Sequence, residues 1–244
     1  MLTDKQDAFG HVMYDYLRGT RSQEIIERDD GFFSISPGPA LYFAHFDQWP
    51  SIEQKAISYA RGRVLDVGCG AGRHSLYLQE RGLDVLGVDN SPLCLDVCRQ
   101  RGVCQLRGLS ITQLSAHLGV FDTVLLLGNN FCLVGNPRRA RWLLRRFAVM
   151  TTLQGRILAG VRNPYLTTEA EHLNYHEWNR SQGRLPGQAR IRVRYKKTVT
   201  PWIEFLMLSP DELHNLVDGT HWHVATVLDD PGGNYVAILE KNVA

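Results

Sequence analysis

The 244-residue sequence predicts an α/β fold with a doubly wound, mostly parallel sheet of seven strands. Short apolar runs alternate with amphipathic stretches between residues 63 and 162, as in successive strand–helix units. Three glycines at alternate positions follow the first apolar run, which indicates a tight strand-to-helix turn. We therefore expect an N-terminal helical lid over residues 1–60 and one domain over residues 61–244, with an insertion at 166–208 after the fifth strand.

The composition is that of an ordinary globular protein, with 44% hydrophobic and 21% charged residues. A net charge of +2 neither favours nor excludes nucleic acid as a partner. The longest apolar runs, such as Val124 to Leu127, are too short to cross a bilayer. The segment Met1 to Asp7 lacks the basic-then-apolar pattern of a secretory signal, so we expect a cytoplasmic protein. The five cysteines form no C-x-x-C pair, and no metal is expected.

The N-terminal 60 residues divide into three parts. Ala8, Val12 and Tyr16 share one helical stripe and predict a helix. Ile25 and Ile26 predict a second, short helical stretch, and two prolines and a glycine make residues 32–39 irregular. The run 42–50 then holds four aromatic residues and a histidine, which is typical either of a satellite core or of a lid over a ligand. We favour the lid, because this run leads directly into the first strand.

The glycine run lies in the segment Arg63 to His74, which should form a strand, a turn and the start of a helix. Glycine allows a positive φ and lets a ligand approach the backbone N–H groups, while the helix directs its positive end at the same point. A second apolar run ends on Asp89, 21 positions after Gly68. An acid at the end of the second strand can accept hydrogen bonds from both hydroxyls of a ribose.

The alternation continues to residue 162. Helices are expected at 73–82, 92–101, 111–118 and 137–150, between strands at 63–68, 84–89, 103–107, 121–127 and 155–162. A ligand should sit where the first and fourth strands end, at the topological switch point.

The insertion should contain a polar helix at 168–179 and two strands at 189–198 and 202–208. Ser209 and Glu212 then form a capping box with Pro210 at the first helical position, and strands follow at 222–228 and 234–240.

Two arginine-rich faces allow different interpretations. The run Arg190 to Lys196 alternates strictly between cationic and apolar residues. This pattern suits either a binding site for a phosphate or carboxylate group or the solvated face of an edge strand. We favour the edge strand, and we interpret the arginines of the helix at 137–150 in the same way, as a solvated helix face.

The loop Asp66-Val67-Gly68-Cys69-Gly70-Ala71-Gly72, with Asp89 closing the next strand, resembles the nucleotide-binding loop of Rossmann-like (class I) S-adenosylmethionine-dependent methyltransferases. The resemblance implies S-adenosyl-L-methionine as cofactor, S-adenosyl-L-homocysteine as product, and an enzyme that transfers a methyl group. A dinucleotide oxidoreductase, or a glycine turn without a ligand, is the alternative. The resemblance implies cofactor-binding roles for Asp66, Gly68, Cys69, Gly70, Gly72, Arg73, Asp89, Asn90, Leu109, Ser110, Gly128 and Asn129.

The sequence departs from parts of this class in two places. Asn129-Asn130-Phe131 stands where adenine- and glutamine-modifying relatives carry Asn/Asp-Pro-Pro-aromatic, which argues against a nucleic-acid amino group as acceptor. Leu109-Ser110 stands where many relatives carry an acid that contacts the adenine, so Ser110 and backbone groups are expected to take that role.

The whole chain also resembles a bacterial group of stand-alone small-molecule methyltransferases, through Glu27 to Gly31, Gly128 to Phe131 and Tyr175-His176-Glu177-x-Asn179-Arg180. Some members of that group methylate C3 of indole in tryptophan-containing cyclic dipeptides, giving a pyrroloindoline by ring closure. The resemblance implies a small aromatic or heteroaromatic acceptor. Residues expected to contact it are Tyr14, Tyr42, Phe46, Asn130, Phe131, Arg162, Tyr165 and Tyr175.

Catalytic help requires a group that can take a proton. We select Tyr16, His45 and His176 as catalytic candidates, and His11, Tyr14 and His172 are further possible bases. Alternative functions are a nucleic-acid or protein methyltransferase that uses the arginine-rich faces, and a catalytically silent cofactor-binding partner. We expect a monomer or homodimer that binds neither nucleic acid nor a membrane.

Overall fold

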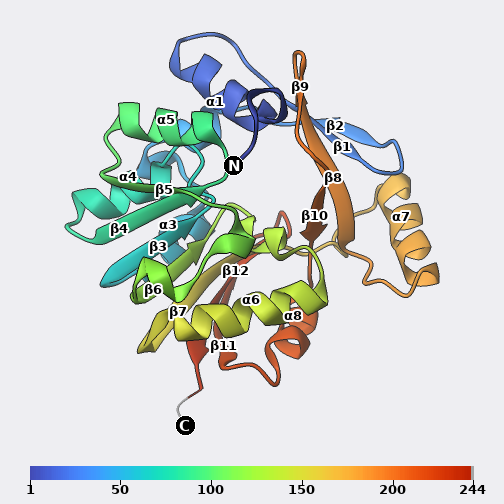
Figure 1. The fold of residues 1–244 in the computed structure, drawn as a ribbon. Helices are drawn as coiled ribbons and strands as arrows, with labels where there is room; N and C mark the ends of the chain where they lie inside the picture. The colour runs from blue at the N-terminus through green and yellow to red at the C-terminus, as the bar shows by residue number, and fades with distance from the viewer. Residues whose placement is uncertain (243–244) are drawn as a thin grey trace.

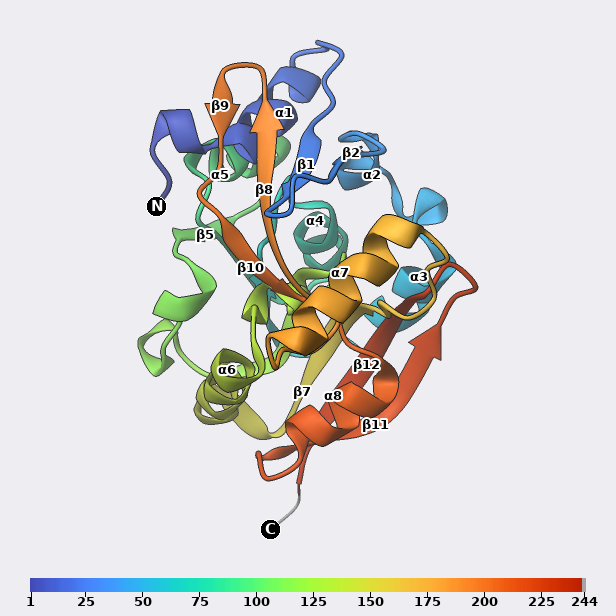
Figure 2. The ribbon, with the colours of Figure 1, turned by 90° about the vertical axis from the view of Figure 1, so that its right-hand side faces the viewer.

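The strands of the molecule form two sheets, and the smaller sheet lies over one edge of the larger one (Figures 1 and 2). The computed structural model describes residues 1–242. The larger sheet has seven strands in the order β11-β12-β7-β6-β3-β4-β5, which confirms the predicted mostly parallel sheet. Its five parallel strands are β3 (Arg63–Val67), β4 (Asp84–Asp89), β5 (Gln105–Gly108), β6 (Phe121–Leu126) and β7 (Thr151–Arg162).

The chain ends in the predicted helix and hairpin. Helix α8 (Pro210–Val217) starts with the expected capping box of Ser209 and Glu212. Strand β12 (Asn234–Lys241) then runs antiparallel to β7, and β11 (Trp222–Asp229) pairs with β12 at the edge. This ending covers the outer side of β7 and completes the sheet.

Helices pack on both faces of the larger sheet. These are α3 (Ser51–Ile57), α4 (Arg73–Glu80), α5 (Pro92–Arg101) and α6 (Pro137–Val149) together with α8. The helix predicted at 111–118 is wrong, because the chain forms two 3₁₀ turns there, Ile111–Gln113 and Ala116–Leu118. Ser110 and Gln113 close the first turn on itself as a capping box, and the extended Ser115 separates the two turns.

The smaller sheet joins the N-terminal segment to the insertion. Its order is β10-β8-β1-β2, with β9 attached to β8. The strands are β1 (Ile25–Arg28), β2 (Phe33–Ile35), β8 (Gln188–Tyr195), β9 (Thr198–Val199) and β10 (Ile203–Leu206). Two predictions were therefore wrong: Ile25 and Ile26 lie in a strand, and residues 33–35 are regular. Pairing of β1 with β8, far along the chain, overrides the weak local preference.

Strand β8 lies between β1 and β10, so the prediction of an edge strand was also wrong. Its outer arginines are not free: Arg192 and Arg194 both bind the carboxylate of Glu27 on β1. Hydrogen bonds from these two arginines lower the pKa of Glu27 to about 2. The cationic face is thus neutralised in part by the neighbouring strand.

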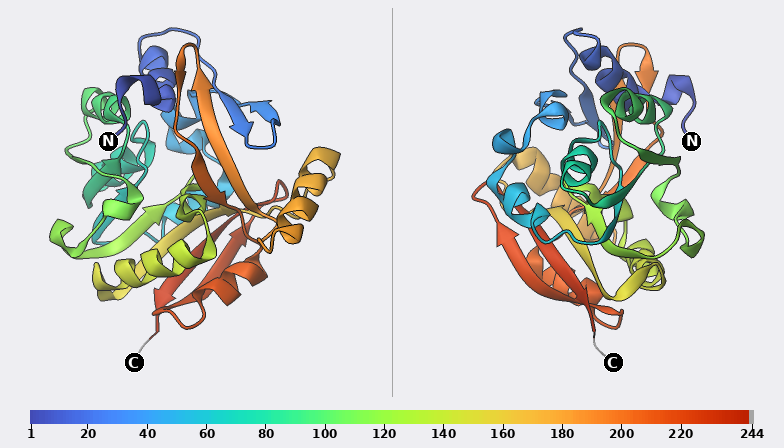
Figure 3. Two further views of the ribbon diagram at one scale, coloured as in Figure 1. Left: turned by 45° about the vertical axis from the view of Figure 1, so that its right-hand side comes forward. Right: turned by 90° about the vertical axis from the view of Figure 1, so that its left-hand side faces the viewer.

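The smaller sheet is held over the carboxyl ends of the parallel strands (Figure 3). Helix α1 (Ala8–Leu17) packs between β8 and α5, and its buried residues Val12 and Met13 share a cluster with Val193 and Tyr195 of β8. Strand β10 contacts the 3₁₀ turn Asn130–Val134, which follows β6. Helix α7 (Ala170–Ser181) lies to one side of the smaller sheet (Figure 1). Within residues 1–242, no helix is long and apolar enough to cross a membrane.

Candidate cofactor and acceptor site

The glycine loop follows β3 and has the conformation that its glycines allow. Gly68, Gly70 and Gly72 have φ values of 74°, 56° and 80°. At Gly70 an added Cβ would meet nothing nearer than the ring of Phe9, at 4.0 Å. At Gly72 it would lie 2.8 Å from Val103 and 3.0 Å from the thiol of Cys98. Gly70 therefore leaves open space beside the loop, whereas Gly72 allows the loop to pack on α5 and the chain after it.

Asp89 closes β4 beside this loop. Its Oδ2 accepts a hydrogen bond from the N–H of Gly70 at 3.0 Å, and its Oδ1 accepts one from the N–H of Ser91 at 2.9 Å. Each carboxylate oxygen keeps a further lone pair for a ligand. Burial raises the pKa of Asp89 to about 6, against the effect of these two hydrogen bonds. The position and the spare lone pairs fit a ribose diol.

Side chains of α4 and α5 hydrogen-bond to the loop and to the strand before it. The Ser75 hydroxyl donates to Oδ2 of the buried Asp66 at 2.6 Å. Cys69 and Cys98 place their sulfur atoms 3.9 Å apart, and the Cys98 thiol donates to the carbonyl of Gly70. Asp66 and Cys69 therefore shape the loop from inside the fold.

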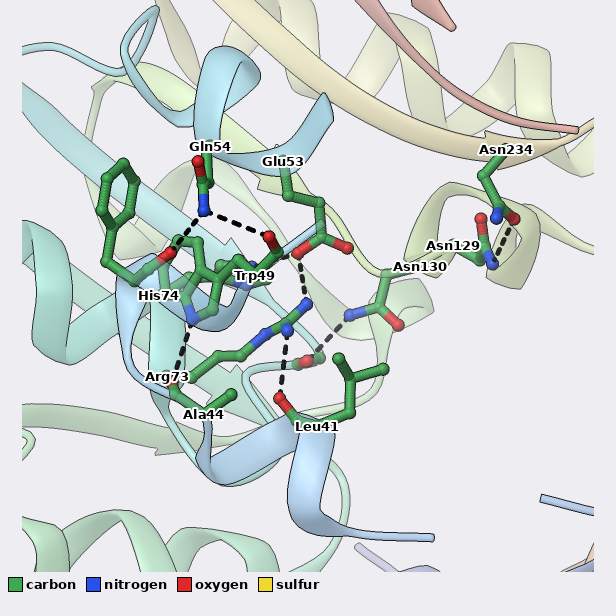
Figure 4. A network of polar contacts seen from close by, with 12 residues as sticks. Leu41, Ala44, Trp49, Glu53, Gln54, Arg73, His74, Asn129, Asn130 and Asn234 are labelled. Carbon is green, nitrogen blue, oxygen red and sulfur yellow. Dashed lines mark hydrogen bonds and ion pairs between the residues drawn. The ribbon is translucent and has the colours of Figure 1, made fainter. Parts of the chain in front are cut away.

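The turn after β6 meets the loop from the other side. Asn130 donates to the carbonyl oxygens of Val67 and Gly68, at 3.0 and 2.8 Å. Asn129 has a φ of 65°, and its amide lies 3.3 Å from Oδ1 of Asn234 (Figure 4). Gly128 is exposed next to them. The structure thus brings Gly128, Asn129 and Asn130 to the loop, with the Asn130 amide already used to hold it.

A buried ionic network lies beneath the same point (Figure 4). The Arg73 guanidinium binds Glu53 of α3 and the carbonyl of Leu41, and His74 lies 3.0 Å from the same Glu53 oxygen. Although burial acts to raise it, the hydrogen bond and charge of His74 and the charge of Arg73 hold the pKa of Glu53 below its ordinary value. Arg73 therefore connects the loop to the N-terminal segment, and its guanidinium also lies beside Gly128.

The edge beyond Asp89 is covered by the start of the chain. The N–H of Leu2 donates to the carbonyl of Asn90 at 2.9 Å, and the Met1 side chain lies over Gly108. Leu109 donates its N–H to the carbonyl of Asp89, and Ser110 caps the next turn. Asn90, Leu109 and Ser110 are thus brought together at this edge of the sheet, and their predicted contact with adenine stays a prediction.

Comparison with known proteins identifies the part of the chain that carries this site. Residues 64–152 match the family model described as a methyltransferase domain. The segment that carries the glycine loop is therefore similar to methyltransferase domains, and we call it the methyltransferase domain. A magnesium-protoporphyrin O-methyltransferase of Rhodobacter capsulatus is 42% identical over 57 residues, which is 23% of this chain and 24% of the relative. A putative methyltransferase of Bacillus subtilis, YqeM, is 36% identical over 100 residues, 39% of this chain and 40% of the relative. The chain thus spans less than half the length of these curated relatives.

Solved structures extend the likeness of the fold to the whole chain. A SAM-dependent methyltransferase from Bacteroides fragilis, in complex with S-adenosyl-L-homocysteine, has a TM-score of 0.84 at 24% identity and covers 100% of this chain and 98% of its own. The 1,6-didemethyltoxoflavin-N1-methyltransferase of Burkholderia thailandensis has a TM-score of 0.52 at 18% identity, covering 80% of this chain and 79% of its own. The open space at Gly70 and the free lone pairs of Asp89 fit the cofactor of this methyltransferase domain.

The aromatic run predicted as a lid divides in two. Tyr42 packs edge-on against Phe9 of α1, with ring centroids 5.2 Å apart, and lies against the cluster that contains Ala71 of the loop. Phe46 instead stacks on Tyr77 of α4 at 4.5 Å, and Trp49 is buried in the same cluster. The satellite-core interpretation therefore describes Phe46 and Trp49, and the structure does not bring Phe46 to the crevice.

The catalytic candidates are dispersed. Tyr16 packs on Phe43 at 4.8 Å on α1, and His45 is exposed at the start of a 3₁₀ turn. His176 is buried on α7, where burial lowers its pKa, and its ring centroid lies 6.1 Å from that of Tyr165. Of the further bases, His11 binds Asp4 and His172 packs on Phe32. These side chains do not converge on one point.

The remaining predicted acceptor contacts also lie apart. Tyr14 accepts a hydrogen bond from Arg18, and Tyr175 donates one to Asp29. Phe131 is fully buried in the core. Two exposed residues lie at the carboxyl edge of the sheet. Arg162 is the last residue of β7, and Tyr165 follows it and donates its hydroxyl to Glu212.

Three residues were not predicted: Phe9, which lies beside Gly70, Glu53, which binds Arg73, and the buried Glu24. Phe9 lies on the predicted helix but off its assumed stripe. Glu53 could not be found without its partner Arg73, which lies 20 residues further on. Glu24 would have been found from alternation, if residues 25–28 had been predicted as a strand.

Proposed function

We propose that the protein transfers a methyl group from S-adenosylmethionine to a small aromatic or heteroaromatic metabolite. The leading specific acceptor is the indole of a tryptophan-containing cyclic dipeptide, methylated at C3 to give a pyrroloindoline. The observation that carries this proposal is the roof over the carboxyl edge: helix α1 and the smaller sheet stand where the acceptor must enter. A roof of this kind favours a small molecule over a polymer.

The side chains below the roof support an aromatic acceptor. The rings of Phe9 and Tyr42 pack together above Gly70, and Ile26 and Val193 line the same cluster from the smaller sheet. Aromatic and aliphatic walls with few polar groups suit a flat, largely uncharged molecule. Several solved neighbours are small-molecule methyltransferases by their names, including the toxoflavin enzyme with its substrate bound.

The chain's own residues would position the reactants. When bound, the cofactor supplies a methyl group on a positively charged sulfur. Asp89 would accept hydrogen bonds from the ribose hydroxyls, and Gly70 would allow close approach of the ligand to the backbone. The faces of Phe9 and Tyr42 would stabilise a nearby positive charge. Holding the nucleophile in line with the methyl carbon supplies several kcal/mol of the barrier reduction.

The alternative, methylation of a nucleic acid or a protein, would use the arginine-rich faces. Arg192 and Arg194 are paired with Glu27, Arg139 with Glu204, and Arg146 donates to carbonyl oxygens. The pairs with Glu27 and Glu204 neutralise part of the positive charge that a row of phosphates would need. The second alternative, a silent cofactor-binding partner, predicts binding without turnover.

The experiment is a methyl-transfer assay on the purified chain with labelled S-adenosylmethionine. We expect turnover of tryptophan-containing cyclic dipeptides that changes little between low and moderate salt, because no phosphates are neutralised. Efficient, salt-sensitive methylation of RNA or DNA would overturn the proposal. Binding of S-adenosylhomocysteine without turnover of any small aromatic compound would favour the silent partner.

A further inference from the structure

We propose that Glu24 accepts a hydrogen bond from an N–H group of the acceptor and takes its proton during methyl transfer. The inference rests on the proposed function and adds a chemical requirement to it: the acceptor carries an N–H group close to its reacting atom. Glu24 belongs to none of the sequence motifs discussed above.

The first observation is a buried carboxyl group without a partner. Glu24 is 1% exposed. Among residues 1–242, no group donates a hydrogen bond to its Oε2 atom, which is inaccessible to solvent. Burial of a polar group without a hydrogen bond costs several kcal/mol, so buried polar groups in native proteins are almost always paired. One physical reason for such an exception is a ligand that supplies the missing donor during function.

The second observation is the face on which Glu24 lies. The N–H of Ser36 donates to the carbonyl of Glu24, which continues the pairing of β2 with β1 by one residue. Side chains alternate along a strand, so Glu24 and Ile26 share one face and Ile25 lies on the other. Ile25 is exposed, whereas Ile26 packs in the cluster below the roof with Val193. Glu24 therefore lies on the face that turns toward the methyltransferase domain.

The third observation connects Glu24 to the loop. Ile26, on the same face as Glu24, packs against the cluster that contains Ala71 of the glycine loop, and Tyr42 packs against the same cluster. After burial, the negative charge of Glu24 is a further cause of the raised pKa of Tyr42. Tyr42 in turn packs on Phe9, the first group that a Cβ at Gly70 would meet. The face of β1 that carries Glu24 and Ile26 thus packs toward the loop at which the cofactor would approach.

The reaction balances with Glu24 as proton acceptor. The nucleophilic atom forms a bond to the methyl carbon while the carbon–sulfur bond breaks. The electron pair of the broken bond stays on sulfur. The sulfonium becomes a neutral thioether. The proton leaves the acceptor's N–H for the Glu24 carboxylate, which becomes a carboxylic acid. For an indole attacked at C3, that N–H is the amide whose nitrogen closes the new ring on C2.

The test compares Glu24→Gln with Glu27→Gln. Glu27 is the matched control, because it lies on the same strand but its carboxylate binds Arg192 and Arg194 on the outer face. With a tryptophan-containing cyclic dipeptide as probe, Glu24→Gln should lower kcat by about 100-fold or more, as for loss of a general base. Its affinity for S-adenosylhomocysteine, measured by calorimetry, should stay within about twofold of wild type. Glu27→Gln should change neither value.

Wild-type turnover by Glu24→Gln would overturn the inference and leave the proposed function intact. A large loss of S-adenosylhomocysteine affinity would also overturn it, because Glu24 would then serve the cofactor. The wild-type protein could also bind S-adenosylhomocysteine but methylate no probe, which would contradict the proposed function. In that case the melting temperature of Glu24→Gln tests the role of Glu24 without an activity assay. If the Glu24 carboxylate binds only a ligand, ligand-free Glu24→Gln should melt at or above the wild-type melting temperature. If the carboxylate stabilises the fold, the variant should melt at a lower temperature, which would overturn the inference.

Discussion

The side-chain amide of Asn130 lies 2.8 Å from the carbonyl oxygen of Gly68 and 3.0 Å from that of Val67, so the turn after β6 holds the loop after β3. An added Cβ at Gly68 would lie 2.7 Å from the same amide nitrogen. The two segments meet at the switch point of the sheet, where the first and fourth predicted strands end. Asn130, selected from the sequence as an acceptor contact, therefore shapes the loop itself.

Changing Asn130 to Asp should disturb this junction without changing its size. The donor would be replaced by a carboxylate that faces two carbonyl oxygens, which leaves buried acceptors unsatisfied at a cost of about 1–3 kcal/mol. We expect lower stability in urea and weaker S-adenosylhomocysteine binding. The exposed Asn174→Asp on α7 is the control and should change neither. Unchanged binding and stability in Asn130→Asp would show that the amide does not hold the loop.

The affinity for S-adenosylhomocysteine should depend on pH through Asp89. Burial raises the pKa of Asp89 to about 6, above its ordinary value of 3.8. An acid with a raised pKa binds its proton more tightly in the folded state, so its ionisation reduces stability as pH rises from about 4 to about 6. Ribose hydroxyls bind the ionised form better, and hydrogen bonds to a charged acceptor contribute about 1.5–3 kcal/mol. Affinity should therefore fall as pH is lowered through about 6.

Calorimetry on two variants checks this prediction. Asp89→Ala should weaken binding at neutral pH by about tenfold or more, and Asp89→Asn should remove the pH dependence near 6. Asp84→Ala, at the other end of β4 and paired at the surface with Arg63, is the control. If Asp89→Ala binds as tightly as wild type, Asp89 does not hold the ribose.

Much of this site could be predicted because its signals are local. The glycines, the preceding Asp66 and the acid Asp89 lie within 24 residues, and their roles follow from φ angles, a helix start and strand spacing. The capping box at Ser209 is likewise complete within four residues. Each of these features depends on neighbours in the sequence, so the pattern alone determines it.

The roof could not be predicted, because it depends on contacts between distant segments. Strand β1 pairs with β8 across about 165 residues, and only this backbone pairing makes a strand of the Ile25-Ile26 doublet. Two adjacent apolar residues have no periodicity that separates helix from strand. The burial of Glu24 follows from the same pairing, since its face is set by the strand. The aromatic run was also ambiguous, because Tyr42 and Phe46 pack on different helices.

Gly70 and Gly72 should respond differently to the same substitution. Gly70→Val strains the backbone, because the φ of Gly70 is 56°, but its side chain meets open space beside Phe9, so the domain should lose less stability than with Gly72→Val while the cofactor is blocked. Gly72→Val would collide with Val103 and Cys98 and should destabilise the whole domain. Binding of S-adenosylhomocysteine and thermal unfolding, measured on both variants, separate the two effects. Normal binding by Gly70→Val would mean that the cofactor does not approach the loop there.

The last prediction concerns Asp7, which attaches the roof helix to the methyltransferase domain. Its fully buried carboxylate accepts a hydrogen bond from the N–H of Gly10 at the start of α1 and another from the N–H of Leu93 at the start of α5. One side chain therefore caps two helices, where a negative charge is favourable at both N-termini. Asp7→Ala removes both bonds and leaves two buried donors without a partner.

We expect Asp7→Ala to loosen α1 more than the sheet. Each lost cap is worth about 1 kcal/mol, which is too little to unfold the seven-stranded domain but enough to increase local opening. Hydrogen exchange should therefore speed up in α1 and change little in β3 and β6. Turnover should fall more than S-adenosylhomocysteine affinity if, as we propose, the roof encloses the acceptor while the loop and Asp89 hold the cofactor. Asp4→Ala, which removes only the surface contact with His11, is the control. Equal exchange rates of α1 in Asp7→Ala and Asp4→Ala would show that Asp7 does not hold the roof in place.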